Sequence, residues 1–110
     1  MGKGDSLGEF EQLVLLALIR LGDEAYGLSV RRELEERAGR EAAIGAVYAT
    51  LDRLEEKGLV TSSLAGATAA RGGRARRCFR LTAEGRRRLR ETQQALARMW
   101  QGLGKDWRPA

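Results

Sequence analysis

The stretch GLVTSSLAGATAARGGRARRCFRLT, residues 58–82, decides how this chain folds. Its two ends, residues 59–62 and 76–81, have the composition of short strands. In the second of them Phe79 and Leu81 alternate with more polar neighbours, in the two-residue period of a half-buried strand. Small residues and glycines fill the middle. The stretch therefore predicts a β-hairpin with a long connecting loop.

Three helices are predicted before the hairpin, and a glycine follows each of them. They cover residues 9–21, about 23–38 and 45–57. The first is apolar on nearly every side, which is more apolar surface than a small domain can bury alone. The other two each show one apolar stripe at helical spacing. These stripes are Tyr26, Val30, Leu34 and Ala38 in the second helix, and Ile44, Val47, Tyr48, Leu51 and Leu54 in the third.

Thr82 is predicted to cap a fourth helix that extends to Gln101. The order helix, helix, helix, strand, strand, helix is typical of the winged helix–turn–helix fold, in which the hairpin is the wing. We therefore expect a mainly α fold with a small β-hairpin, followed by a C-terminal dimerisation helix. The predicted organisation is a flexible N-terminus over residues 1–8, a DNA-binding domain over 9–81, the dimerisation helix over 82–101 and a tail over 102–110.

Basic charge is concentrated in the hairpin. Residues 58–81 carry five arginines and no acidic side chain, whereas residues 1–57 carry eight basic and twelve acidic side chains. Localised basic charge is typical of a surface that binds phosphate, and a solvated arginine-rich face is the alternative.

In a DNA-binding winged helix, the third helix enters the major groove and the wing follows the DNA backbone. The face of the third helix opposite its apolar stripe combines small residues, which allow close approach to base edges, with longer side chains that can reach them. Glycines in the hairpin expose backbone amides to phosphate. Arg80 lies deeper on its strand, where an ion pair with an acid of the domain is the alternative. The residues predicted in this way to bind DNA are Ala46, Ala49, Thr50, Arg53, Lys57, Arg71, Gly72, Gly73, Arg74, Arg76 and Arg77.

The last predicted helix carries an apolar seam. Its positions from Leu89 to Leu103 alternate steps of three and four, as in a coiled coil, and the domain already has a core of its own. Together with the apolar first helix, this seam predicts a homodimer that reads a palindromic or pseudo-palindromic site. The residues predicted at the dimer interface are Phe10, Leu13, Leu16, Leu89, Leu96, Met99, Trp100 and Leu103.

The chain lacks the residues that an enzyme, a metal-binding protein or a membrane protein would need. The chain has no histidine, one cysteine and no phosphate loop or metal-ligand spacing, so we expect no enzyme activity, cofactor or metal. The longest apolar run, residues 13–19, is too short to span a bilayer, and a single cysteine fits a reducing cytoplasm. A protein-interaction module without specific DNA binding is the alternative function, because winged helices also bind proteins.

Three segments resemble the PadR-like transcriptional regulators. They are the pair Tyr26 and Gly27, then GAVYATLDRLEEKGLV at residues 45–60, and GGRARRCFRLTAEG at residues 72–85. Their shared order and spacing make the resemblance specific, and it extends over about residues 7–100. It implies a bacterial cytoplasmic repressor that binds double-stranded operator DNA as a dimer, with the final helix lying across a partner subunit.

The resemblance also assigns individual residues. It places Tyr48 close to the DNA backbone, whereas the periodicity of the third helix places this residue in the core. The chain resembles the short branch of the family, in which some members bind flat aromatic compounds between subunits with aromatic residues of the last helix. Trp100 therefore either lines a site for a small aromatic effector or simply packs the dimer. The chain departs from the family pattern at Ala46 and Val47, where Thr and Leu are frequent, and at Cys78, where an aromatic is usual.

Overall fold

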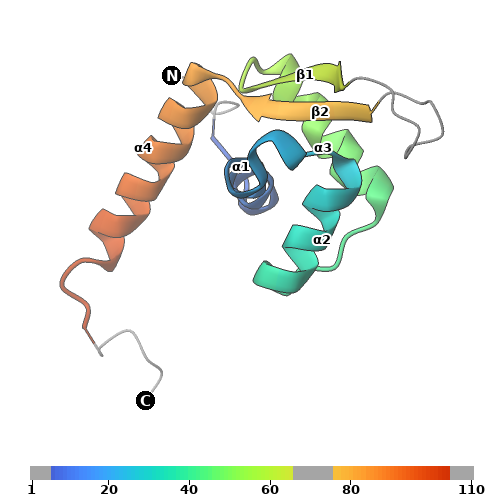
Figure 1. The fold of residues 1–110 in the computed structure, drawn as a ribbon. Coiled ribbons are helices and arrows are strands. Elements are labelled where there is room, and N and C mark those ends of the chain that lie inside the picture. Colours follow the sequence, from blue (N-terminus) through green and yellow to red (C-terminus); the bar gives the residue numbers. More distant parts are fainter. Residues whose placement is uncertain (1–5, 66–75, 105–110) are drawn as a thin grey trace.

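The computed structural model describes residues 6–65 and 76–104 (Figure 1). Within these residues the predicted order of helices and strands is confirmed, with one short 3-10 helix in addition. The elements are α1 (Glu9–Leu21), η2 (Gly22–Glu24), α2 (Gly27–Ala38), α3 (Ile44–Glu56), β1 (Val60–Ala65), β2 (Arg76–Leu81) and α4 (Ala83–Trp100). Most of the predicted N-terminus and tail, residues 1–5 and 105–110, lie outside the described residues.

The second helix begins later than predicted. The acidic residues Asp23 and Glu24 form the 3-10 turn η2 instead, and α2 starts after Tyr26. The Tyr26 backbone amide donates to Ser29 Oγ at 3.0 Å, and the Ser29 hydroxyl donates to the Glu24 carbonyl at 2.6 Å. These bonds satisfy backbone groups that a helix start leaves open, and they fix where α2 begins.

The wing is a two-stranded antiparallel hairpin. β1 extends beyond the predicted range of residues 59–62 because it pairs with all of β2. The register runs from Val60 opposite Leu81 to Ala65 opposite Arg76. Residues 66–75, which connect the two strands, lie outside the described part of the chain.

A third extended segment joins the wing to the start of α2. The amide of Phe79 donates to the carbonyl of Ala25 at 2.9 Å, and Tyr26 and Cys78 form an isolated antiparallel bridge. The side chain of Phe79 is buried in the core, while Cys78 is only partly buried. The wing is therefore anchored by main-chain bonds to the beginning of the helix–turn–helix unit.

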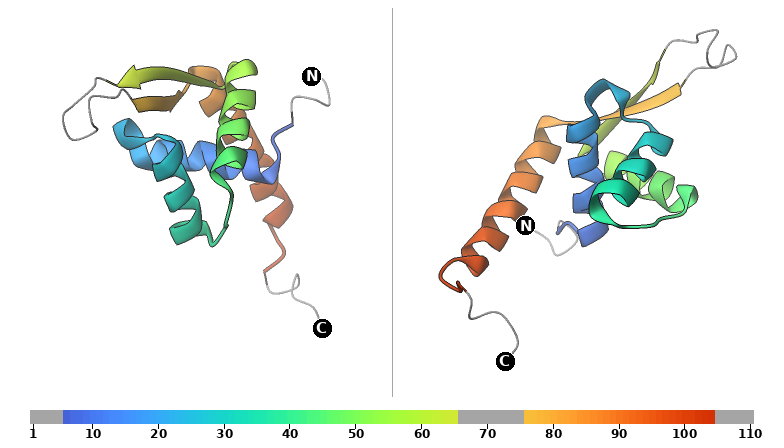
Figure 2. Two further views of the ribbon diagram at one scale, coloured as in Figure 1. Left: turned by 90° about the vertical axis from the view of Figure 1, so that its right-hand side faces the viewer. Right: turned by 60° about the horizontal axis from the view of Figure 1, so that its bottom comes forward.

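α1 packs against α2, α3 and β2 (Figure 2). Its buried side chains belong to the hydrophobic core. Val14, Leu15 and Leu18 are at most 3% exposed. Burying each such side chain is worth about 1.5–3 kcal/mol. Ala38, predicted as part of the α2 stripe, is exposed at the helix end. The other elements contribute Ala25, Val30, Leu34, Val47, Leu51, Leu54, Leu59, Val60 and Phe79 to the core.

α4 is attached to the domain by its first turn and by Leu89, which packs against the core, and its C-terminal part projects away (Figures 1 and 2). The Thr82 hydroxyl caps the helix by accepting the Gly85 amide at 3.0 Å and donates to the Gly58 carbonyl at 2.7 Å. A Cβ atom on Gly85 would lie 2.1 Å from the Leu59 carbonyl oxygen, so only glycine allows this approach. In the part of the chain that the structure describes, no helix is long and apolar enough to cross a membrane.

Candidate nucleic-acid interface

α3 presents a face of small side chains to solvent. Ala46 and Ala49 are exposed, as predicted. Thr50 is only 3% exposed, so the prediction that it lies on the open face is wrong. It follows Val47 by three residues and precedes Leu54 by four, which places it on the buried side of the helix. The outward face of α3 is therefore narrower than predicted.

Tyr48 lies at the edge of this face and is 37% exposed. A Cβ atom on Gly27 would lie 2.3 Å from its Cζ and 2.4 Å from its Oη, so the ring rests directly on the backbone at the start of α2. Its centroid is 6.4 Å from the ring of Phe79 in β2. This exposed position agrees with the family resemblance and corrects the core position predicted from periodicity.

Arg76 is the first residue of β2, at the end of the paired strands farthest from α3 and α4 in the sequence, and it lies against the residue that precedes α2. Its guanidinium carbon is 3.9 Å from the ring centroid of Tyr26. Within the described residues, the ion pairs of β2 involve Arg77 and Arg80 and not Arg76. An arginine held on an aromatic face keeps N–H donors available at its edge.

We call the group of Tyr26, Gly27, Tyr48 and Arg76 the aromatic cluster. Its members come from the start of α2, from α3 and from β2, so it marks the point where helix–turn–helix and wing meet. The stripe of the second helix placed Tyr26 in the core. The dipeptide of Tyr26 and Gly27 was the signal for its special role, since a glycine at a helix start leaves room for a neighbouring ring.

The Arg77 side chain is bonded to α3, although 38% of it is exposed. Its side chain forms ion pairs with Asp52 at 3.0 Å and with Glu55 at 2.8 Å. Burial lowers the pKa of the Arg77 guanidinium, but the bonds to Asp52 and Glu55 outweigh this effect and raise the pKa above its ordinary value. The predicted DNA-binding residue is thus bonded within the domain.

Arg53 and Lys57 both contact a buried carboxylate on α1. Glu11 is 7% exposed, and its Oε2 atom is 2.9 Å from Lys57 Nζ and 3.4 Å from Arg53 Nε. Burial raises the pKa of the Glu11 carboxyl, but the Gly8 amide, Lys57 and Arg53 together lower it below its ordinary value. The sequence did not predict this role of Glu11, because a glutamate in the first turn of a helix is ordinarily solvated.

The remaining predicted wing residues divide into two groups. Arg71, Gly72, Gly73 and Arg74 lie outside the described residues. Arg80 forms an ion pair with Asp23 of η2, which is the alternative expected from its position on the strand.

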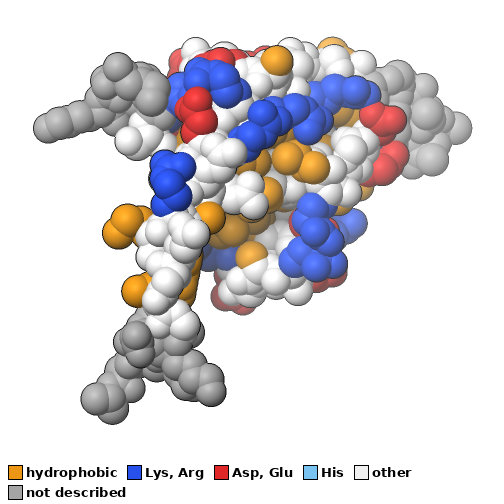
Figure 3. All heavy atoms as spheres, turned by 90° about the vertical axis from the view of Figure 1, so that its left-hand side faces the viewer, with side chains coloured by type: hydrophobic (Ala, Val, Ile, Leu, Met, Phe, Trp, Pro, Cys, Tyr) orange, Lys and Arg blue, Asp and Glu red, His pale blue; other side chains and the backbone are white. Residues whose placement is uncertain are grey.

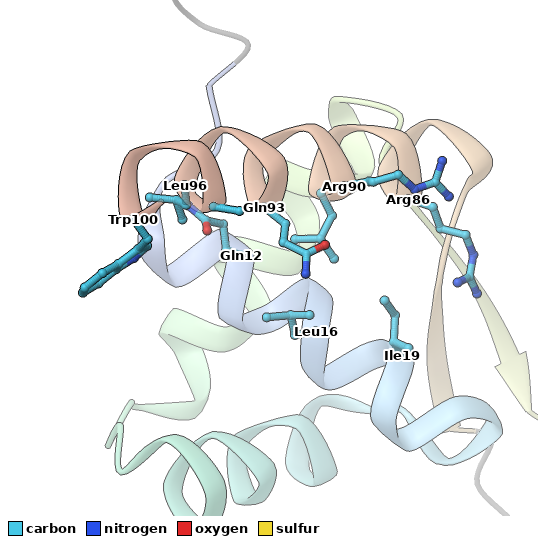
Figure 4. A pocket seen from close by; sticks show the side chains of 10 residues that line it. Gln12, Leu16, Ile19, Arg86, Arg90, Gln93, Leu96 and Trp100 are labelled. Atoms are coloured by element: carbon cyan, nitrogen blue, oxygen red, sulfur yellow. The ribbon is translucent and has the colours of Figure 1, made fainter. Parts of the chain in front are cut away.

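An open groove of about 590 Å³ lies between α1 and α4 (Figure 4). Leu16 and Ile19 from α1, and Leu96 and Trp100 from α4, supply its apolar lining. Its polar side chains come from both helices as well, and they are Gln12, Arg86, Arg90 and Gln93. The groove brings together residues that are about 80 positions apart in the sequence.

The residues predicted at the dimer interface fall into two sets. Phe10, Leu13 and Leu89 are partly buried against the core of their own domain. The other five range from 37% exposed for Leu103 to 76% for Met99. They are Leu16, Leu96, Met99, Trp100 and Leu103. Figure 3 shows hydrophobic side chains exposed along the projecting helix, below a band of basic side chains.

The fold and the interface define a winged helix–turn–helix DNA-binding protein. The chain has a three-helix unit, a basic hairpin anchored to it, and aromatic and arginine side chains where the two meet. The model of the transcriptional regulator PadR-like family matches residues 15–91. The chain therefore belongs to this family of DNA-binding transcriptional regulators, which is not a family of enzymes.

Solved structures share the fold. A PadR family transcription regulator from Clostridium difficile is 26% identical, with a TM-score of 0.73 over 89% of this chain and 97% of that one. A PadR family regulator from Eggerthella lenta is 30% identical, with a TM-score of 0.67 over 93% of this chain and 88% of that one. The protein in the hsRosR-S4 complex is 31% identical, with a TM-score of 0.62 over 98% of this chain and 83% of that one. No curated protein matches the chain.

Proposed function

We propose that this regulator is a dimeric repressor that acts in the cytoplasm on a palindromic or pseudo-palindromic operator. In this proposal α3 enters the major groove and the wing follows the DNA backbone. The observation that carries it is the exposed face of α3 with Ala46, Tyr48 and Ala49, together with Arg76 of the wing. Arg76 stacks on Tyr26, next to the glycine against which the Tyr48 ring rests. Small side chains let a helix approach base edges, and the tyrosine hydroxyl and guanidinium are suited to the flanking phosphates.

The longer basic residues complete the proposed contact surface. Arg53 is suited to a guanine because its side chain is 52% exposed and its bond to Glu11 is long, at 3.4 Å. Lys57 is more firmly held, at 2.9 Å, and its proposed contact is with phosphate. From the sequence alone we add Arg71 and Arg74, with Gly72 and Gly73 supplying amide donors.

The dimer is supported by apolar surface that the single chain leaves open. Leu96, Met99 and Trp100 lie on a helix that projects from the domain, and each is at least 50% exposed. Leu16 and Ile19 of α1 line the adjoining groove. Contiguous exposed apolar side chains of this kind mark interaction surfaces. A twofold dimer would present two α3 helices to half-sites about 34 Å apart.

A small aromatic effector is the proposed releasing signal. The groove between α1 and α4 has a volume typical of ligand sites, and the indole of Trp100 offers a flat face at one end. The alternative occupant is the α4 helix of the partner subunit, with Trp100 as a packing residue. Quenching of tryptophan fluorescence by flat aromatic compounds, compared between the full chain and Trp100→Phe, distinguishes the two, and equal quenching in both proteins speaks for packing.

The deciding experiment is fluorescence anisotropy of a labelled duplex from the region upstream of this protein's own gene. A scrambled duplex of the same composition is the control, and both are titrated at several salt concentrations. We expect tight binding to the native duplex that weakens steeply with salt, because phosphate contacts release counterions. Equal weak binding to both duplexes would mean that the operator lies elsewhere. No binding to either at low salt would favour the protein-interaction module instead.

A further inference from the structure

We propose that Arg77 is a positioning residue, which holds the wing in a fixed orientation against α3, and that it does not bind phosphate. The inference rests on the DNA-binding function proposed above and gives one of its arginines a different role. It follows from where each nitrogen atom of the guanidinium is bonded.

All three nitrogens of the Arg77 guanidinium have partners inside the domain. One terminal nitrogen lies 3.0 Å from Asp52 Oδ1, and the other donates to Glu55 Oε1 at 2.8 Å. The Nε atom donates to the Ser62 hydroxyl at 3.4 Å. The fork of an arginine is rigid and planar, so bonds on all of its nitrogens fix its orientation.

These partners connect three elements of the interface. Asp52 and Glu55 belong to α3, Ser62 to β1 and Arg77 itself to β2. The Ser62 hydroxyl also lies 2.9 Å from Glu55 Oε2, and the Arg77 guanidinium carbon lies 4.8 Å from the ring centroid of Phe79. Both strands of the wing are thus tied to the last two turns of α3.

The neighbouring arginine provides the contrast. Successive side chains of a strand point to opposite faces. Arg76 accordingly leaves β2 on the other side and stacks on Tyr26, without an acidic partner among the described residues. Of these two adjacent arginines, Arg76 can contact DNA, whereas the guanidinium of Arg77 is already bonded within the domain.

Two consequences follow for recognition. The wing sets where the DNA backbone lies relative to α3. If the wing is not held in place, α3 is no longer aligned with the base edges. Asp52 and Glu55 would also repel phosphate if they were not neutralised by Arg77. Because phosphate contacts carry no sequence information, loss of a positioning residue and loss of a phosphate ligand have different signatures.

The test compares binding to two duplexes, one selected from a random pool by the wild-type protein and one scrambled. Arg77→Met keeps the stem over Phe79 and removes the ionic bonds. We expect the ratio of the two affinities to fall about tenfold, the effect of losing two partly exposed ion pairs. Binding to the scrambled duplex should weaken much less, through the carboxylates of Asp52 and Glu55 that Arg77 no longer neutralises. Equal losses on both duplexes, with a salt slope shallower by about 0.9, would instead make Arg77 a phosphate ligand.

A charge swap provides the rescue. In Arg77→Glu with Glu55→Arg, the reversed pair keeps the link from β2 to α3, and Asp52 stays next to a positive charge. We expect each single variant to lower the ratio and the double variant to restore it to within about threefold of wild type. A double variant that discriminates no better than Arg77→Glu alone would overturn the proposal.

Thermal denaturation accompanies every variant. If Arg77→Met does not fold, Asp52→Asn with Glu55→Gln removes the negative charges that pair with Arg77 while leaving the arginine in place. This variant carries two fewer negative charges, which alone would strengthen binding to any duplex; we nevertheless expect the ratio to fall. An unchanged ratio would overturn the role of Arg77. A wild-type protein that selects no duplex from the pool would instead contradict the proposed function itself.

Discussion

The ring of Tyr48 occupies the space that a side chain at position 27 would need, since a Cβ atom on Gly27 would lie 2.3 Å from Tyr48 Cζ. The contact joins α3 to the first residue of α2 and sets the exposure of the tyrosine at the same time. Position 27 therefore couples the packing of the helix–turn–helix unit to the side chain proposed to contact DNA.

Gly27→Ala should displace the Tyr48 ring. Because the ring is the far end of a rotatable side chain, we expect a loss of about 1–3 kcal/mol in unfolding free energy together with weaker DNA binding. Urea denaturation and anisotropy measure the two effects. In a Tyr48→Ala background the clash is absent, and the same alanine should be neutral or stabilising by up to about 1 kcal/mol. A similar loss of stability in both backgrounds would contradict the role of the ring.

Gly85→Ala should destabilise the attachment of α4, because its Cβ would meet the Leu59 carbonyl oxygen at 2.1 Å and backbone cannot move aside as a side chain can. We expect a loss of about 1–3 kcal/mol in urea denaturation. Gly45→Ala is the matched control, since nothing lies within 4 Å of a Cβ there. Alanine at that helical position should stabilise by about 0.5–1 kcal/mol. Losses of equal size at both positions would argue against the close approach.

Glu11→Gln should lose the charge that Lys57 and Arg53 neutralise, at a cost of about 1–3 kcal/mol at pH 7. The pKa of Glu11 is lowered in the folded protein, so its stabilising contribution is present above the ordinary value of 4.5 and is lost as the pH falls through the lowered pKa. The difference between wild type and variant in unfolding free energy should therefore shrink in acid. Glu9→Gln, at a residue whose side chain is 77% exposed, should differ little from wild type at either pH.

Arg76→Ala should weaken binding to every duplex by a similar factor and reduce the salt slope by about 0.9, the signature of one lost phosphate contact. Anisotropy at several salt concentrations measures it. Arg87→Ala is the control, since Arg87 is paired with Glu84 and Glu91 on α4 and should leave the slope unchanged. A loss confined to the selected duplex would mean that Arg76 reads a base.

Much of the fold was predictable because hydrophobic period and glycine positions report on short-range structure. The bounds of α1 and β2 were predicted from these signals, and the start of α4 from Thr82. The pairing of charges was not predictable. Arg77 meets Glu55 only when the hairpin folds back over α3, and Glu11 meets Lys57 across 46 positions. Even within a single helix, Thr50 was wrongly predicted to lie on the exposed face. A polar residue next to an apolar stripe is ordinarily exposed, but this one is buried.

Met99→Glu should prevent dimerisation, because it places a charge in the apolar seam of α4, where the native side chain is 76% exposed in the single chain. Sedimentation velocity should show a monomer that keeps the helical circular dichroism of the wild type. Gln94→Glu, on the side of α4 away from the seam, is the control and should leave the mass unchanged. A wild-type protein that is already monomeric at micromolar concentration would contradict the dimer.

α4 contacts the core of the domain from Thr82 to Leu89, so a tilt of this N-terminal part displaces the far end of the helix. Its pivot is the turn from Thr82 to Gly85, fixed against Gly58 and Leu59, and its 18 residues extend about 27 Å from there. A rotation of about 10° at the pivot moves the far end by about 5 Å, roughly one and a half base pairs of DNA. In a dimer held together through the far ends of α4, the same small tilt would instead change the distance between the two α3 helices. That distance would then no longer match the spacing of the half-sites on the DNA. Operator affinity could then be abolished without any change inside either DNA-binding domain.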